Sequence, residues 1–265
     1  MNEEHFCLDD SPEFRMVELD EVTSTNDFLR SYRPVGPERR MTLVTAEFQT
    51  SGRGAGSNHW ESRHGENLLF SLLVHPRHIP ADRMFVLSEV LALAIFRALS
   101  DFVEWQTANG KRQMINDEGA FAIKWPNDVY WEDKKICGML IENELQGDRI
   151  ERCVMGVGVN VNQMTFESDA PNPVSLAQIL GEQVERRFVL ERIMEYFTRY
   201  YDKEQEEIHE MYLGHLYRKD EQHIYRDKDG EFRGTIVDVE PTGYLNIIDE
   251  MGVKRRYAFK EVEYV

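Results

Sequence analysis

Apolar residues along the first 218 positions follow two spacings in turn. Short runs rich in apolar residues, of the length of a buried strand, cover residues 14–19, 43–47 and 68–74. Residues 81–102 instead place apolar side chains three and four positions apart, which predicts a helix with one face in the core. The same two patterns predict further strands over 120–125, 129–131, 135–142 and 153–161, a helix over 26–32 and a long helix over 189–216.

The segment after residue 218 has a different pattern. Short strand candidates alternate there with turn signals such as Asp229-Gly230 and Thr242-Gly243. Regularly spaced turns in so short a segment are typical of a small β-barrel. We therefore expect an α+β protein with a mixed sheet and flanking helices over residues 1–218, followed by a small all-β domain over 219–265.

Composition and charge narrow the classes of function. No apolar run approaches the ~20 residues that span a bilayer, and the acidic start at 1–5 is followed by no apolar stretch of a secretory signal. We expect a cytoplasmic protein that has no membrane partner. The formal net charge of −17 argues against nucleic-acid binding, because that function needs clustered Lys and Arg to replace counterions.

The cysteines and histidines predict no metal site. The three cysteines are scattered without CxxC spacing, which also argues against a disulfide framework. We interpret Cys137 as a small buried hydrophobe rather than a nucleophile, because no basic residue or helix start adjoins it. Four histidines lie close together in sequence but lack the i, i+4 spacing of a zinc-binding helix; these are His59, His64, His75 and His78.

A glycine-rich stretch follows directly on the predicted strand at 43–47. It runs from Gln49 through Gly52-Arg53-Gly54-Ala55-Gly56 to Trp60. Such a loop lets backbone N–H groups approach an anion closely, and Arg53 adds a bidentate donor. It matches neither the phosphate-loop nor the dinucleotide pattern, because no helix pattern follows it. A mobile surface loop is the alternative, and Trp60 with the apolar strand after it favours a ligand loop.

Three further motifs are ambiguous when taken singly. Lys-Trp-Pro-Asn-Asp at 124–128 groups a cation, an aromatic ring and polar acceptors around a rigid turn, or is an ordinary turn with a solvated lysine. Lys135 with Gly138 could reach a phosphate, or could belong to an exposed hairpin. Gly156-Val-Gly158-Val-Asn160 suggests that a ligand or another backbone approaches a strand closely, or marks a bulge.

Ser24-Thr25-Asn26 stands where the first helix is predicted to begin. A hydroxyl at this position is often a helix N-cap. The same hydroxyls could hydrogen-bond the ring of a polar ligand.

Together these motifs have an order and spacing that resemble those of biotin protein ligases. The resemblance runs from about Val17 to Asn162, and the small C-terminal β-domain also suits that family. It implies a catalytic domain similar to those of class II synthetases and biotin/lipoate ligases, followed by an SH3-like barrel. The chain resembles the short form, in which no DNA-binding helix-turn-helix region precedes the catalytic part.

The resemblance also implies a role for each motif residue. Catalytic roles would fall to Arg53, Lys135, Lys124 and Asp128, of which Lys135 would contact the activated carboxyl–phosphate group and Asp128 would position a metal ion or the incoming lysine. Substrate contacts would come from Ser24, Thr25, Asn26, Gln49, Gly52, Arg53, Gly54, Ala55, Trp60, Lys135 and Gly138. Nucleotide contacts would come from Asn127, Gly158 and Asn160. No resident metal site is implied.

The implied reaction joins biotin to ATP, with Mg²⁺, to give biotinyl-5′-AMP. The biotin then passes to a lysine of a biotin carboxyl carrier protein. A homodimer is a possible assembly. Two alternatives remain open at this point: a lipoate–protein ligase, whose substrate would need a narrower apolar slot and no ureido partners, and a non-catalytic module that binds biotin or a nucleotide. A protein-interaction scaffold built on the C-terminal domain would leave the glycine-rich loop unexplained.

One position departs from the pattern of many family members, in which a basic or amide residue follows Gly-Arg-Gly. This chain has Ala55 there, so a donor that could help to retain the adenylate is missing. Arg63 is a candidate for the substitute cation.

Overall fold

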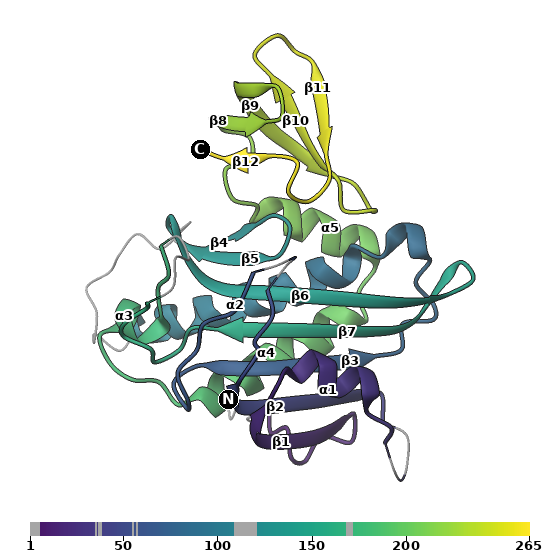
Figure 1. Ribbon diagram of the computed structural model, residues 1–265, viewed down its shortest axis with the longest axis vertical. Coiled ribbons are helices and arrows are strands. Elements are labelled where there is room, and N and C mark those ends of the chain that lie inside the picture. Colours follow the sequence, from purple (N-terminus) through teal and green to yellow (C-terminus); the bar gives the residue numbers. More distant parts are fainter. Residues whose placement is uncertain are drawn as a thin grey trace.

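The computed structural model describes residues 6–34, 36, 39–54, 56, 58–108, 121–167 and 172–265. Its larger domain is built on a mixed sheet of seven strands in the order β1-β2-β3-β7-β6-β5-β4 (Figure 1). β1 and β2 are parallel, and all the other neighbours are antiparallel. The strands are β1 Phe14–Val22, β2 Met41–Gln49, β3 Leu68–Val74, β4 Phe121–Lys124, β5 Asp128–Trp131, β6 Lys134–Gln146 and β7 Arg149–Val159.

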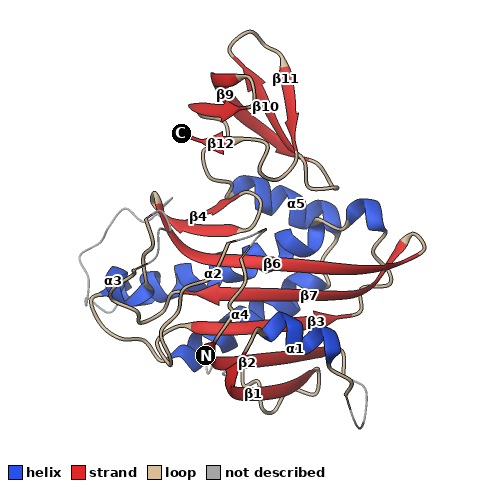
Figure 2. Cartoon of the chain, viewed as in Figure 1, coloured by secondary structure: helices blue, strands red, loops and turns tan. Residues whose placement is uncertain are grey.

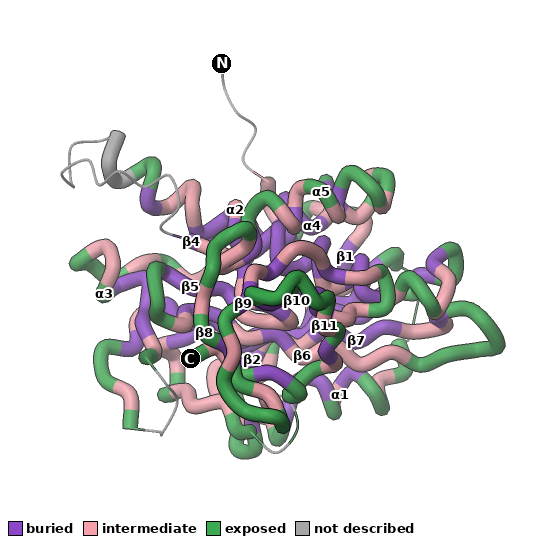
Figure 3. Tube along the Cα trace, turned by 90° about the horizontal axis from the view of Figure 1, so that it is seen from above, coloured by how far each residue is buried: buried purple, intermediate pink, exposed green. Residues whose placement is uncertain are grey.

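Helices cover both faces of this sheet (Figures 1 and 3). α2 (Val86–Ala108), α4 (Arg186–Tyr201) and α5 (Gln205–Gly214) lie behind it and enclose the main core, while α1 (Thr25–Ser31) lies on the opposite face. Leu29 of α1 packs there on apolar side chains of β2, β3 and β7. β3 is therefore buried at every position, as its apolar run predicts, and the one polar residue in it, Ser71, is buried too. A single-turn α3 covers Leu176–Leu180.

The C-terminal domain is an antiparallel sheet of five strands in the order β11-β10-β9-β8-β12. It stands above the β4–β5 edge and α5 (Figure 2). Trp125 Nε1 donates to Gly243 O at 2.9 Å, and Phe85 N donates to Pro241 O at 3.2 Å, so the two domains are joined by hydrogen bonds. The strands are β8 Gln222–Asp227, β9 Gly230–Val239, β10 Leu245–Asp249, β11 Lys254–Tyr257 and β12 Glu263–Tyr264.

The α+β fold with a mixed sheet, flanking helices and a C-terminal β-domain is confirmed. All the predicted strands are present, although Ala120 lies outside the described residues. The helix predicted over 81–102 begins later, at Val86, because Ala81–Arg83 form a separate 3₁₀ turn, and it continues beyond the predicted end to Ala108. The division of the chain at 218/219 stays a prediction.

The single long helix predicted over 189–216 is wrong. The chain forms α4 and α5, which both pack against α2 and are separated by the polar residues 202–204. Glu204 is extended, with φ −61° and ψ 139°, and it begins α5 in a new direction. The break lets Phe197 and Tyr212, from the two helices, both be fully buried.

In the described part of the chain, no helix is both long enough and apolar enough to cross a membrane.

Candidate functional site

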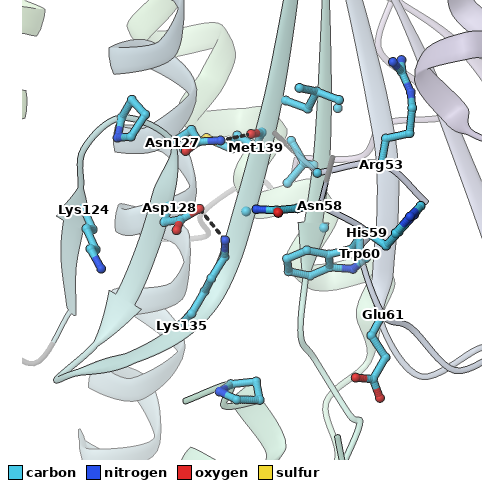
Figure 4. A pocket seen from close by; sticks show the side chains of 18 of the residues that line it. Arg53, Asn58, His59, Trp60, Glu61, Lys124, Asn127, Asp128, Lys135 and Met139 are labelled. Carbon is cyan, nitrogen blue, oxygen red and sulfur yellow. Dashed lines mark hydrogen bonds and ion pairs between the residues drawn. The ribbon is translucent and has the colours of Figure 1, made fainter. Parts of the chain in front are cut away.

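One cavity of about 960 Å³ collects nearly all the predicted site residues. Its walls are the start of α1, the glycine-rich loop, the turn between β4 and β5, the glycines of β6 and β7, and a segment of the C-terminal domain. Figure 4 shows Lys135, Asp128 and Trp60 around this space. Of the predicted residues, Gly52 does not line the cavity, and Ala55 lies outside the described residues. The others converge: Ser24, Thr25, Asn26, Gln49, Arg53, Gly54, Trp60, Lys124, Asn127, Asp128, Lys135, Gly138, Gly158 and Asn160.

Neutral side chains, held by hydrogen bonds, line one end of the cavity; they are Thr25, Asn26 and Gln49. Gln49 Oε1 accepts from Thr25 N at 2.8 Å and from Thr25 Oγ1 at 3.1 Å, which leaves the Gln49 amide nitrogen as a donor. Asn26 Nδ2 donates to Leu140 O at 3.1 Å and to Glu142 Oε2 at 2.8 Å. Both amide protons of Asn26 are therefore used within the protein, so this residue fixes the position of α1.

Ser24 is the N-cap of α1, as the sequence suggested. Its Oγ accepts from Asp27 N at 3.5 Å, a long contact, and its side chain lines the cavity. The hydroxyl proton therefore remains able to donate to a ligand.

Glycines form the floor of the cavity. Gly138 of β6 and Gly158 of β7 are directly opposite each other in the sheet, and the Trp60 ring packs over both. Gly156 is covered in the same way by Asn26, whose Oδ1 would lie 2.2 Å from a Cβ at that position. β7 keeps regular register with β3 and β6 along this stretch, so the alternative of a bulge is excluded. The groups that approach the strand are side chains of the protein itself.

The glycine-rich loop folds back on itself. Trp60 N donates to Gly52 O at 3.0 Å, and Gly54 N donates to Asn58 O at 2.7 Å. Arg53 and His59 form an isolated antiparallel bridge between these bonds. A Cβ on Gly52 would lie 3.0 Å from Trp60 O. The absence of a side chain at Gly52 therefore lets the two arms of the loop lie close together, and Gly52 is not part of the cavity wall.

Arg53 is held between two carboxylates. Its Nη2 lies 2.9 Å from Asp27 Oδ1 and 2.8 Å from Glu142 Oε2, which ties the loop to α1 and β6. Its Nε is buried and has no hydrogen-bond partner among the described residues. A buried N–H without a partner is costly.

Lys135 and Asp128 form an ion pair in the middle of the cavity. The Nζ of Lys135 lies 2.6 Å from Asp128 Oδ1, and the same ammonium is 5.8 Å from the centre of the Trp60 ring. Asp128 pairs with Gly138 across β5 and β6, and the missing side chain at Gly138 leaves room for the lysine. Figure 4 shows this ion pair beside the bond that Asn127 donates to Met139 O, which anchors the turn to β6.

Lys124 lies between two tyrosines. Its Nζ lies 4.5 Å from the centre of the Tyr130 ring and 4.7 Å from that of Tyr264, and it donates to Tyr130 Oη at 3.0 Å. Burial lowers the pKa of Lys124, and the charge of Asp128 partly offsets this effect. Tyr264 belongs to β12, so the C-terminal domain takes part in the cavity.

Sequence reasoning missed this contribution of the C-terminal domain. Five of its residues line the cavity, and no local pattern in the tail marks them; they are Phe259, Lys260, Val262, Glu263 and Tyr264. Arg63, the suggested substitute cation, is not among the lining residues, and its Nη2 pairs with Glu167 at 2.8 Å. In the described ranges, no group of three or more His, Cys, Asp or Glu residues could hold a metal ion.

The same region of the chain matches a known family. The model of the biotin/lipoate A/B protein ligase family matches residues 19–160, more than half of the chain. The chain belongs to that family. The matched range contains α1, the glycine-rich loop, the turn at 124–128 and the glycine floor, and ends before the C-terminal domain that completes the cavity.

Relatives in the biotin/lipoate ligase family extend the likeness. The bifunctional ligase/repressor BirA of Bacillus subtilis is 30% identical over 232 residues, which cover 82% of this chain and 64% of the relative. This chain thus spans less than two thirds of that relative's length. A biotin–[acetyl-CoA-carboxylase] ligase of Paracoccus denitrificans is 30% identical over 161 residues, 59% of this chain and 61% of that protein.

A solved structure shares the architecture of both domains. The biotin protein ligase of Aquifex aeolicus, solved in complex with biotin and ATP, superposes with a TM-score of 0.70 and 26% identity. The match covers 94% of this chain and 99% of the Aquifex chain.

Proposed function

We propose that this protein is an ATP-dependent biotin–protein ligase. It would form biotinyl-5′-AMP and transfer the biotin to a lysine of a biotin carboxyl carrier protein. The observation that carries the proposal is that a neutral hydrogen-bonding end and a cationic middle share one cavity. The names of the relatives, and the biotin and ATP bound to the Aquifex ligase, support this substrate pair.

The neutral end suits the ureido ring of biotin. That ring carries two N–H donors and one carbonyl acceptor. The free hydroxyl proton of Ser24 and the free amide nitrogen of Gln49 could donate to the carbonyl. A lipoyl ring offers no matching polar group, so these donors would remain unpaired, at a cost of about 1–3 kcal/mol each. This asymmetry favours biotin over lipoate.

The cationic middle suits the phosphate. In the first step a carboxylate oxygen of biotin attacks the α-phosphorus of ATP, the bond to the β-phosphate oxygen breaks, and pyrophosphate leaves. Both reactants are anions, so fixed cations must offset their repulsion. Lys135 supplies one such charge, and Arg53, which also lines the cavity, supplies a second. No covalent protein nucleophile is needed.

The second step transfers biotin to the carrier. The uncharged lysine amine attacks the acyl carbon, AMP leaves with the anhydride oxygen, and the amine releases a proton. Asp128 is the carboxylate at this point of the cavity, paired with Lys135. When the phosphate draws Lys135 away, Asp128 can accept a hydrogen bond from the incoming amine. We assign Asp128 this positioning role.

We expect Mg²⁺ to bind at this site only together with the nucleotide. Mg²⁺ keeps several waters and is usually held by one or two carboxylates together with the substrate phosphates. Asp128 and Glu263 are carboxylates of the cavity wall, and the described residues form no cluster of a resident metal site. The ion would neutralise phosphate charge when it is bound.

Exchange of labelled pyrophosphate into ATP tests the proposal directly. Purified protein is incubated with ATP, labelled pyrophosphate and either biotin, lipoate or no acid. We expect label in ATP only when biotin is present, because exchange requires reversible formation of the adenylate. Lipoate-dependent exchange would identify a lipoate ligase, and binding of biotin without exchange would identify a non-catalytic module.

A further inference from the structure

Lys260 of the C-terminal domain touches the glycine-rich loop of the catalytic domain. It lies in the turn between β11 and β12 and has a left-handed backbone, with φ +69°. Its ammonium rests on Gly56, where a Cβ would lie 2.3 Å from the Lys260 Nζ. Gly56 itself has φ +70°, so this position of the loop favours glycine for its backbone as well as for the approach of Lys260.

Among the residues that the structure describes, four Lys and Arg side chains line the cavity, and three of them already have hydrogen-bond partners. Lys135 pairs with Asp128, Arg53 pairs with Asp27 and Glu142, and Lys124 donates to Tyr130; the fourth is Lys260. Within the described ranges, Lys260 has no carboxylate or hydroxyl partner, and its only ring contact is 5.7 Å from Phe259. An ammonium held against a backbone loop without a counter-ion is ready to accept one.

The exposed position of Lys260 indicates which part of the nucleotide it contacts. Lys260 is exposed, whereas Lys135 lies half-buried over the glycine floor. The outer end of the cavity suits the part of the nucleotide that must leave after the first step. The chain carries a net charge of −17, which repels polyphosphates, so a local cation is needed to hold them.

We propose that Lys260 binds the β- and γ-phosphates of ATP against the glycine-rich loop, and thereby holds the pyrophosphate group in line to leave. This role rests on the proposed ligase activity and extends it. It gives the C-terminal domain a place in adenylate formation, because Lys260 would contact the leaving group. The cation that accompanies the loop is then Lys260 and not Arg63, which is paired outside the cavity.

Lys260→Met removes the charge and keeps most of the side chain's length. We expect the KM for ATP, and the KM for pyrophosphate in the exchange reaction, to rise about 10-fold, the scale of one charge-assisted hydrogen bond. The Kd for biotin should stay unchanged, because the neutral end of the cavity is untouched. Lys260→Arg should recover most of the affinity for both phosphates.

Lys254→Met is the matched control, because Lys254 is an exposed lysine of β11 that does not line the cavity. It should leave both KM values unchanged. The proposal would be overturned if the KM for ATP and the KM for pyrophosphate were each the same in Lys260→Met as in wild type.

Calorimetric titration with inorganic pyrophosphate separates this inference from the proposed function. If wild type shows no biotin-dependent exchange, the ligase proposal fails. The titration still tests Lys260: weaker pyrophosphate binding by Lys260→Met than by wild type supports the anion site, and equal binding or none by wild type refutes it.

Discussion

The indole of Trp60 lies so close to Gly158 that no side chain could stand between them. A Cβ on Gly158 would be 2.3 Å from Trp60 Cε2 and 2.6 Å from its Nε1. Gly138, opposite on β6, leaves similar room for the far edge of the ring. Gly138 and Gly158, which come from two separate motifs, thus allow Trp60 at the end of the glycine-rich loop to pack flat on the sheet.

Gly158→Ala should push the Trp60 ring off the floor of the cavity. Overpacking of this kind costs about 1–3 kcal/mol, and we expect it to appear as biotin binding weakened about 10-fold. Calorimetric titration with biotin measures this effect, and tryptophan emission reports the moved ring. Gly214→Ala is the control, because a Cβ there meets nothing within 4 Å. Unchanged biotin affinity in Gly158→Ala would show that ring docking is irrelevant to binding.

Lys135→Ala tests the central cation. Removal of one preorganised electrostatic donor should lower the rate of adenylate formation about 100- to 1,000-fold. Biotin-dependent pyrophosphate exchange measures that rate. The neighbouring Lys134 is exposed at the start of β6 and does not line the cavity, so Lys134→Ala should leave exchange intact. A Lys135→Ala variant with wild-type exchange would remove this residue from the mechanism.

Much of the site could be predicted from sequence because its motifs are local. The N-cap at Ser24, the loop at Gly52–Gly54 and the turn at 124–128 each combine a backbone signal with a chemical one. The strands beside them are short apolar runs, which also read directly from the pattern. The structure brings residues of each of these motifs to one cavity, although Gly52 does not line it.

The remainder depends on contacts between distant parts of the chain. Glu142 lies well beyond the glycine-rich loop, and nothing in either segment shows that it pairs with Arg53. Lys260 and Tyr264 reach the cavity only because the C-terminal sheet docks on the β4–β5 edge. The break between α4 and α5 was missed for a related reason: continuous helical spacing does not reveal that residues 202–204 turn.

The cysteines should differ in reactivity. Cys137 and Cys153 are fully buried, and burial raises the pKa of both thiols, whereas Cys7 is partly exposed. Only a thiolate reacts readily. Treatment of the folded protein with iodoacetamide should therefore modify Cys7 alone, and unfolding should expose all three. Intact-mass and peptide analysis distinguish these states, and a label on Cys137 in the folded chain would contradict the assignment.

A histidine links the two domains. His209 of α5 has Nδ1 2.8 Å from Glu89 Oε1 of α2 and Nε2 3.4 Å from Asp238 Oδ1 of β9. The hydrogen bond with Glu89 is the main cause that raises the pKa of His209, and burial is the main cause that raises the pKa of Glu89. The buried Tyr212 adjoins the same carboxylate. Protonated His209 therefore bridges carboxylates from both domains.

His209→Gln should remove a pH-dependent part of the stability. Because the folded pKa of His209 lies above its usual value near 6.5, its stabilisation is complete below pH ~6.5 and is lost as pH rises through the folded pKa. The pKa of Glu89 is also raised, so this carboxyl group likewise makes the free energy of unfolding fall as pH rises, starting from the lower usual pKa of a carboxyl group. Thermal unfolding should give a difference in Tm between wild type and His209→Gln that is largest near pH 6 and shrinks towards pH 9. His223→Gln is the control, since His223 pairs with Glu221 inside the C-terminal segment. A difference that stays constant with pH would mean that His209 stabilises the interface by packing alone.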